Sequence, residues 1–268
     1  MSNLATRIIT AIVLVLVVLA VLFVLPSPSA LYFFALVFLV AGWEWAGLIK
    51  PSASAVKIMF LILLAVVAFL PGVIPDLGVA WLFIYGGALC WLLFTLILLM
   101  NIPVNGLAKK TLAGLMTLLP AWYALNEIMS QPDGAYYFLG CVAIVAAADI
   151  GAYFSGRSFG KHKLAPAISP GKTIEGFVGG LIMAGIVTAL LADLTDRNAL
   201  IYLLPGCLIA AVSVSGDLWI SRFKRLADVK DSGKILPGHG GVLDRVDSLL
   251  AALPFFALLA VEGQTFGL

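Results

Sequence analysis

Nine long apolar segments divide this chain, and they restrict its fold more than any other feature. Each is close to the ~20 residues that an α-helix needs to cross a bilayer. Transmembrane β-strands are excluded, because the apolar residues run continuously and do not alternate with polar ones. We therefore expect an all-α, polytopic integral membrane protein with about nine transmembrane helices. The segments run roughly over residues 8–25, 31–49, 56–74, 79–100, 111–129, 135–155, 174–192, 199–220 and 248–265.

The composition supports the same class of protein. Of the 268 residues, 62% are hydrophobic and 11% are charged, whereas about 25% of the residues of a soluble domain are charged. A soluble fold of this length still exposes a large part of its surface to water, so it could not hide so many apolar side chains. The net charge of +2 gives no indication of a nucleic-acid partner.

The positions of the basic residues predict the orientation in the membrane. All but one of the 16 Lys and Arg residues precede the first segment or lie in the loops after segments two, four, six and eight. Arg197 is the exception. Because basic loops stay in the cytoplasm, we expect the N-terminus and the long polar loops 156–173 and 221–247 to be cytoplasmic, and the C-terminus to lie outside. The expected location is the cytoplasmic (inner) membrane.

The chain divides by its chemistry into two regions. Residues 1–130 would supply about five membrane helices with few polar groups, and residues 131–268 about four helices together with both polar loops. Glu44 and Glu127 are exceptions in the first region. An acid inside a membrane helix is energetically expensive and therefore invites a functional interpretation, but either side chain could equally be a hydrogen-bond partner between helices.

Small residues in the apolar segments predict local packing. Gly176 and Gly180 lie four residues apart and would let the seventh segment approach a neighbouring helix closely. The cysteines lie in apolar segments without metal-binding spacing, and we predict that they are buried, unpaired thiols: Cys90, Cys141 and Cys207.

The loop between segments six and seven contains the first candidate site residues. Asp149 lies near the end of segment six, and the Gly and Pro residues that follow should stop any helix. Thr173 can cap segment seven, with Glu175 in its first turn. The Gly-Lys-Thr run is no Walker A loop, because position 166 is proline and no strand is predicted before it. Lys172 is either a phosphate ligand or an ordinary basic residue of a cytoplasmic loop.

Segment eight places an acid inside the membrane, directly beneath several cations. At helical spacings of four and three residues, Asp217, Ser221 and Lys224 share one face. Asp244 and Asp247 also share a face at the start of segment nine. Because the two helices are antiparallel and joined by one polar loop, their ends can adjoin and bring three carboxylates together with several cations.

The residue types of this cluster favour a metal-bridged polyphosphate. Carboxylate oxygens without Cys or paired His suit Mg²⁺ better than zinc, and Mg²⁺ usually bridges protein carboxylates and substrate phosphates. The segment Gly238–Gly241 offers backbone N–H groups as a nest for phosphate oxygens. We assign His239 to the positioning of substrate or loop, not to acid–base chemistry. The alternative is a salt-bridged loop with a purely structural role.

These polar loops resemble those of a known family, the phosphatidate cytidylyltransferases or CDP-diacylglycerol synthases. The resemblance covers roughly the C-terminal half of the chain. The matching signature comprises Ser221, Lys224, Arg225, Lys230, Asp231, Gly233, Leu236, Pro237, His239, Gly240, Gly241, Asp244, Arg245 and Asp247. A second similar region comprises Asp149, Ala152, Tyr153, Gly156, Arg157, Phe159, Gly160, Lys161, Ile168, Ser169, Pro170, Lys172, Thr173, Glu175 and Gly176.

The resemblance implies a reaction of CTP with phosphatidate that gives CDP-diacylglycerol and pyrophosphate for phospholipid synthesis. It also implies Mg²⁺ as cofactor and a homodimer, and it leaves a second, monovalent cation open. The lipid phosphate would attack the α-phosphorus of CTP in line, so that catalysis rests on positioning and charge neutralisation.

The resemblance also implies roles for individual residues. Asp217 and Asp244, joined by Asp247, would hold Mg²⁺, and Lys224 and Arg225 would neutralise phosphate charge as catalytic residues. Substrate binding would fall to Ser169, Lys172, Ser221, Lys230, Asp231, Gly238, His239, Gly240, Gly241 and Arg245. Further candidates from the second region are Asp149, Arg157, Lys161 and Glu175.

Three rival functions belong to other classes. A related CTP-using lipid enzyme, such as a polyprenol kinase or an archaeal-lipid cytidylyltransferase, would differ only in its acceptor lipid. A CDP-alcohol phosphotransferase would need a run of spaced aspartates that the chain lacks. A transporter would place polar residues near the bilayer midplane and show weak symmetry between its halves. Here the charges gather on one side of the membrane, which favours an enzyme.

Overall fold

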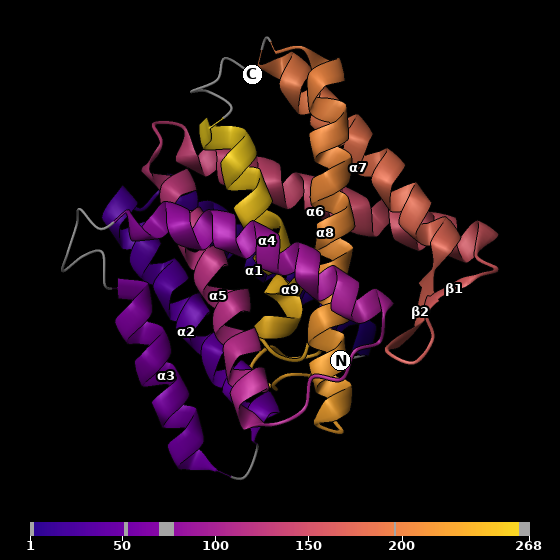
Figure 1. Cartoon of the computed structure of the whole chain (residues 1–268). Coiled ribbons are helices and arrows are strands. Elements are labelled where there is room, and N and C mark those ends of the chain that lie inside the picture. Colours follow the sequence, from indigo (N-terminus) through magenta and orange to yellow (C-terminus); the bar gives the residue numbers. More distant parts are fainter. Residues whose placement is uncertain (1–2, 51–52, 70–77, 196, 263–268) are drawn as a thin grey trace.

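The computed structural model describes residues 3–50, 53–69, 78–195 and 197–262, and these form a bundle of α-helices (Figure 1). Each of the nine predicted apolar segments coincides with one helix of the described chain, so the all-α class is confirmed. The predicted segments 56–74 and 248–265 extend beyond the described residues. The helices are α1 (Asn3–Phe23), α2 (Ser27–Ile49), α3 (Ser54–Phe69), α4 (Val79–Leu99), α5 (Leu107–Ser130), α6 (Gly134–Phe159), α7 (Ile174–Leu194), α8 (Ala199–Leu226) and α9 (Leu243–Ala257), followed by the π-helical turn η3 (Leu258–Glu262).

Five of the described helices are long and apolar enough to cross a membrane. They are α2, α4, α6, α7 and α8. The apolar parts of α1 and α3, Ile8–Phe23 and Ser54–Phe69, are shorter than a typical span. The protein is therefore an all-α, multipass membrane protein.

A small β-hairpin follows α6, and it corrects one expectation. Strand β1 (Lys163–Ala165) pairs antiparallel with β2 (Ser169–Thr173), whereas no strand was predicted before the Gly-Lys-Thr run. Pro166 and Pro170 cannot donate helical hydrogen bonds, and a two-stranded sheet tolerates proline because both strands are edges. The exclusion of a Walker A loop now rests on Pro166 alone.

The helices beside the two polar loops extend further into these loops than predicted. Helix α6 continues to Phe159, α8 continues to Leu226, and α9 already begins at Leu243. The end of α8 stays helical because its polar side chains find partners inside the protein. Arg222, for example, is buried and donates hydrogen bonds to the carbonyl oxygens of Ile97 in α4 and of Ile102 just after α4. The polar loop proper therefore covers only residues 227–242.

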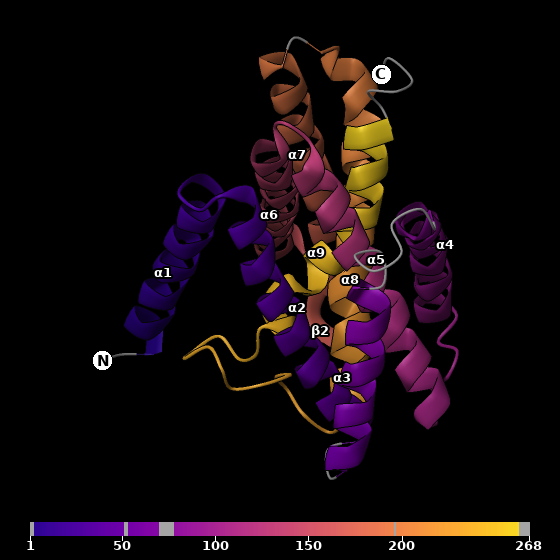
Figure 2. The ribbon, with the colours of Figure 1, turned by 90° about the vertical axis from the view of Figure 1, so that its left-hand side faces the viewer.

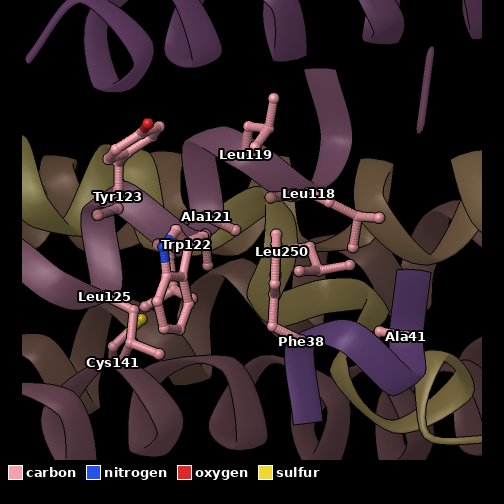
Figure 3. Packing of buried hydrophobic residues seen from close by; sticks show 14 of the residues in the cluster. Phe38, Ala41, Leu118, Leu119, Ala121, Trp122, Tyr123, Leu125, Cys141 and Leu250 are labelled. Atoms are coloured by element: carbon pink, nitrogen blue, oxygen red, sulfur yellow. The ribbon is translucent and has the colours of Figure 1, made fainter. Parts of the chain in front are cut away.

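Helix α5 packs at the centre of the apolar core (Figure 3). Its Leu118 and Trp122 lie beside Phe38 of α2 and Leu250 of α9, and the Phe38 and Trp122 rings are 5.1 Å apart. The core joins helices from both ends of the chain, so the N-terminal helices directly support the C-terminal ones. The three cysteines are unpaired, as predicted, but only Cys141 is buried, whereas Cys90 and Cys207 are partly exposed.

Helices α6 and α7 lie in close contact through glycine, as predicted. A Cβ atom on Gly180 would stand 2.7 Å from the carbonyl oxygen of Ala148, and one on Gly176 would stand 2.8 Å from that of Ala152. Thr173 caps α7 by accepting a 3.1 Å hydrogen bond from the Gly176 N–H. The hairpin that leads into α7 is thereby held against the end of α6.

Helix α1 stands apart from the other helices (Figure 2). At one end it turns into α2, and near its start the Thr10 hydroxyl donates a 3.1 Å hydrogen bond to the carbonyl oxygen of Pro237. The polar loop thus reaches beneath α1. Helix α8 ends and α9 begins at this same end of the bundle (Figures 1 and 2).

Candidate active site

The first charged pair of the site joins the hairpin to α8. Lys172, in β2, lies 2.6 Å from Asp217 Oδ2, and the Ser221 hydroxyl donates to Asp217 Oδ1 at 3.1 Å. Asp217 and Ser221 therefore share one face of α8, as their spacing predicted. Lys172 reaches this face because the hairpin folds back over the end of α8.

The second charged pair joins α8 to α9. Lys224 Nζ lies 2.7 Å from Asp244 Oδ1, and both side chains are buried. Asp244 Oδ2 accepts hydrogen bonds from the N–H groups of Ser232 and Gly241, at 2.8 and 3.0 Å. Burial alone would raise the pKa of Asp244, but these donors, Lys224 first among them, outweigh burial and lower it. Asp244 is therefore held as a carboxylate.

Asp247 lies one helical turn beyond Asp244 and is also buried. Helices α8 and α9 approach closely here, since a Cβ atom on Gly216 would stand 2.5 Å from the Asp247 carbonyl oxygen. Burial and the negative charge of Asp217 raise the pKa of Asp247 to about 8. The Lys172 and Lys224 charges also act on Asp247. The three carboxylates thus occupy one electrostatic neighbourhood, as predicted.

The two lysines already neutralise part of this cluster. Within the described part of the chain, no three His, Cys, Asp or Glu side chains surround one metal-sized position. Both oxygens of Asp244 are occupied by donors from the protein. The oxygens of Asp217 likewise face Lys172 and Ser221, but both of these partners are side chains, whereas Asp244 holds two backbone N–H groups. Mg²⁺ commonly takes one or two carboxylates and completes its shell with water and phosphate, and Asp217 with the nearby Asp247 suits such an ion.

A polar cavity of about 360 Å³ opens beside the first pair. Asp149 and Arg157 of α6 line it together with Lys172, and Arg157 donates a 3.0 Å hydrogen bond to the Tyr153 hydroxyl. The charges of Lys172 and Asp217 both act on Asp149. This cavity can receive a charged, water-soluble ligand directly beside the carboxylates.

An apolar groove of about 600 Å³ lies on the other side, between α1 and the bundle. Its lining includes Val18 of α1, Phe38 of α2 and Leu249 of α9. Arg245 is the single charged side chain among the described residues that line it. Arg245 directly follows Asp244 in α9, so the groove reaches the helical turn that carries the second charged pair.

The glycine loop closes tightly around His239. Gly238 and Gly240 have φ angles of 75° and 83°, which glycine adopts without strain. The Gly240 carbonyl oxygen accepts from Leu236 N–H at 2.9 Å. The Gly241 N–H is bound to Asp244, so it is engaged within the protein. Among the described residues, the buried His239 Nδ1 atom has no hydrogen-bond partner, which leaves it for a ligand.

The remaining candidate residues lie at the margin of the cluster. Arg225 donates to the carbonyl oxygen of Ile168, next to Ser169, at 3.4 Å. Lys230 and Asp231 are exposed in the loop. Glu175 does not face the carboxylates: it accepts hydrogen bonds from the Lys161 N–H and the His162 N–H, and it lies 2.7 Å from His162 Nδ1. His162 is exposed to solvent and is paired with Glu175.

Two residues near the cluster have contacts that the sequence did not predict. Ser232 contacts both Asp244 and Glu44, and Glu44 contacts the start of α9. Serine in a polar loop carries no recognisable signal. Glu44 was marked only by its charge inside an apolar segment, and that feature did not indicate its partner.

Comparison with known proteins identifies the family to which this chain is similar. The profile of the cytidylyltransferase family matches residues 5–261. A phosphatidate cytidylyltransferase of Pseudomonas aeruginosa is 39% identical over 94% of this chain and 95% of its own length. That of Haemophilus influenzae is 36% identical over 94% of this chain and 96% of its own. That of Staphylococcus haemolyticus is 48% identical over 50% of this chain and 52% of its own.

Proposed function

The chain belongs to the cytidylyltransferase family, and we propose that it transfers the cytidylyl group of CTP to phosphatidate at its two lysine–aspartate pairs. The products are CDP-diacylglycerol and pyrophosphate. One observation supports the location of this reaction: Lys172 of the first pair lines the polar cavity, and Arg245, which follows Asp244 of the second pair, lines the apolar groove. A site that joins a soluble nucleotide to a lipid needs both surroundings.

In the proposed reaction, a phosphatidate oxygen forms a bond to the α-phosphorus of CTP, and the bond to pyrophosphate breaks. The attacking oxygen is already an anion, so the protein need not supply a strong base. Its task is to align the two phosphates and to offset their repulsion. Lys172 and Lys224 exchange part of their contact with Asp217 and Asp244 for phosphate oxygens, while Arg225 and Lys230 approach from the margin.

Asp217 and Asp247 are the proposed Mg²⁺ ligands, and Asp244 holds Lys224 and the loop in place beside them. The bound ion would neutralise negative charge on the triphosphate. This assignment rests on the partners of the two carboxylates: Asp244 is bound to backbone N–H groups of the loop, whereas Asp217 is bound to the side chains of Lys172 and Ser221, which substrate phosphate could draw away.

The apolar groove is the proposed seat of the acyl chains of phosphatidate. Its apolar lining suits acyl chains, and Arg245 in that lining, next to Asp244 in the chain, would meet the lipid phosphate. The groove lies against α1, which stands apart from the other helices (Figure 2) and would give the lipid a route from the bilayer. His239 would contact the substrate through its unpaired ring nitrogen.

The membrane arrangement is also part of the proposal. We propose nine spans in the cytoplasmic (inner) membrane, with the N-terminus and the site on the cytoplasmic side and the C-terminus outside. The distribution of basic residues supports this orientation, and α1 begins at the same end of the bundle as the polar loop. The resemblance supports a homodimer and leaves a monovalent cation as an addition to Mg²⁺.

The test is the transfer of label from CTP, labelled at its α-phosphorus, into the lipid phase by purified protein in detergent. We expect transfer that requires phosphatidate and a divalent cation. Asp217→Asn should lower kcat/KM by roughly 10²–10³-fold, the range for losing one group that stabilises transition-state charge.

Asp228→Asn is the matched control. Asp228 is exposed and has a φ angle of 55°, which asparagine also accepts. The activity of the Asp228→Asn variant should stay within about twofold of wild type. Transfer to a polyprenol lipid but not to phosphatidate would show that phosphatidate is not the acceptor. Full activity of Asp217→Asn would contradict the proposed location of the active site.

A further inference from the structure

Glu44 is a buried acid that the chemistry above does not use. It lies in α2, far along the chain from the polar loop, and only 4% of its surface is exposed. Its Oε1 atom accepts a 3.1 Å hydrogen bond from the Val242 N–H, and its Oε2 atom accepts a 2.7 Å bond from the Leu243 N–H. The Ser232 hydroxyl also donates to Oε2 at 3.1 Å. The carboxylate therefore binds the polar loop at two places, at Ser232 and where the loop enters α9.

Glu44 completes the N-terminus of α9. The first N–H groups of a helix lack partners within the helix, and the residue before α9, Val242, offers no side-chain cap. Glu44 binds the N–H groups of Val242 and Leu243, while Asp244 binds that of Gly241. A carboxylate at this end also interacts favourably with the helix dipole. The cap thus comes from α2, at the other end of the chain.

Two glycines leave room for this carboxylate. A Cβ atom on Gly233 would collide with Glu44 Oε1, and one on Gly241 would collide with Oε2. Neither glycine has a positive φ angle among the described backbone outliers, so the close approach of Glu44 explains them better than backbone strain does. The loop is built around the Glu44 carboxylate.

Ser232 connects Glu44 to the charged cluster. Its hydroxyl donates to Glu44, and its N–H donates to Asp244 Oδ2. Trp45, the neighbour of Glu44, is fully buried, and its ring lies 4.7 Å from that of Phe223 on α8. Helix α2 is therefore fixed against α8 at this point, and Glu44 transmits that position to the start of α9.

We propose that Glu44 is a positioning residue for the metal-binding carboxylates. It sets where α9 begins, and hence where Asp244 and Asp247 lie relative to Asp217. This inference rests on the proposed Mg²⁺ site. Loss of the Glu44 charge would let the start of α9 shift and would weaken cation binding without removing any ligand.

The test measures the binding of Mn²⁺, a spectroscopic substitute for Mg²⁺, to purified protein in detergent without substrate. Electron paramagnetic resonance reports the free ion. Glu44→Gln keeps the size of the side chain but places an NH₂ group against N–H donors. We expect a dissociation constant for Mn²⁺ raised roughly tenfold, as for residues that orient metal ligands. The Mg²⁺ concentration for half-maximal activity should rise in parallel, and excess Mg²⁺ should restore turnover.

Glu127→Gln is the matched control, because Glu127 is another acid in an apolar helix and is half-buried in α5. It should bind Mn²⁺ as wild type does. Ser232→Ala is a milder variant that removes one hydrogen bond and should shift Mn²⁺ binding in the same direction. It keeps the test decisive if Glu44→Gln does not fold.

The outcomes separate this inference from the proposed metal site. Wild-type protein that binds no Mn²⁺ would overturn both. Wild-type binding with unchanged affinity in folded Glu44→Gln, or in Ser232→Ala if the former does not fold, would overturn the role of Glu44 alone. A lower unfolding temperature with unchanged Mn²⁺ affinity would show a purely structural cap and would also overturn it.

Discussion

At the residue scale, the site stabilises the buried charges of Lys224 and Asp244 by pairing them across two helices. Lys224 and Asp244 are separated by 20 positions in sequence and are both buried, yet their charged atoms lie 2.7 Å apart. Burying either of these side-chain charges without the other is strongly unfavourable, so the pairing offsets the desolvation cost of both. The pair therefore stabilises the contact between α8 and α9 as well as the site.

Removing Lys224 should test this coupling. We expect Lys224→Met to lower the free energy of unfolding by about 3–5 kcal/mol, the range for leaving one buried charge without its partner. Lys234→Met, at an exposed position of the polar loop, should change the free energy of unfolding by less than about 0.5 kcal/mol. Equilibrium unfolding in detergent measures both. Equal stability of the two variants would contradict the role of the pair.

At the element scale, close helix contacts place the hairpin over α8. Helix α7 follows the hairpin directly and packs on α6 through backbone and glycine atoms rather than through large side chains. In a bilayer, packing of this kind replaces the hydrophobic effect as the force between helices. The position of Lys172 beside Asp217 therefore depends on the small residues Gly176 and Gly180, which follow the hairpin in the chain.

Adding one methyl group should distinguish contact glycines from neutral ones. Gly180→Ala would place its Cβ 2.7 Å from a carbonyl oxygen of α6, and we expect a loss of about 1–3 kcal/mol in the free energy of unfolding. Gly86→Ala in α4 meets open space and should gain about 0.5–1 kcal/mol from better helix propensity. Thermal unfolding in detergent compares them. A destabilised Gly86→Ala, or an unaffected Gly180→Ala, would contradict the packing described for these helices.

At the scale of the whole molecule, the two ends of the chain build one catalytic region. Helices α1 and α2 supply a wall of the apolar groove, while α9 supplies the opposite wall and the carboxylates. The polar cavity comes from α6, the hairpin and α7. The N-terminal helices therefore do more than anchor the protein.

Filling the groove should affect one substrate and not the other. We expect Val18→Trp, in the groove, to raise the KM for phosphatidate roughly tenfold, since a loss of about 1.4 kcal/mol in binding is a factor of ten. The KM for CTP should change little. Leu16→Trp, on the exposed face of α1, is the matched control and should leave both values near wild type. Kinetics in mixed micelles with varied lipid fraction give the two constants, and equal effects of the two variants would exclude the groove as the lipid site.

Much of the site could be predicted because its residues recur at helical spacings. Asp217, Ser221 and Lys224 lie on one face of α8 for a reason that belongs to every α-helix. Antiparallel helices joined by one loop bring Asp244 near that face. Spacing could not decide whether Arg157 and Glu175 join the same cluster. In the structure Arg157 lines the cavity beside Lys172, whereas Glu175 turns to His162 instead.

The sequence by itself determined that this protein is a helical membrane protein with one polar end, because continuous apolar segments and clustered basic residues are local properties of the chain. Its dense local motif also singled out the candidate residues for the reaction. Only the tertiary structure decided that Lys224 pairs with Asp244, that Lys172 reaches Asp217 from a β-hairpin, and that Glu44 caps α9. Each of these contacts joins positions far apart in the chain. A buried charge needs a partner, and only the tertiary structure decides which group lies close enough to pair with it.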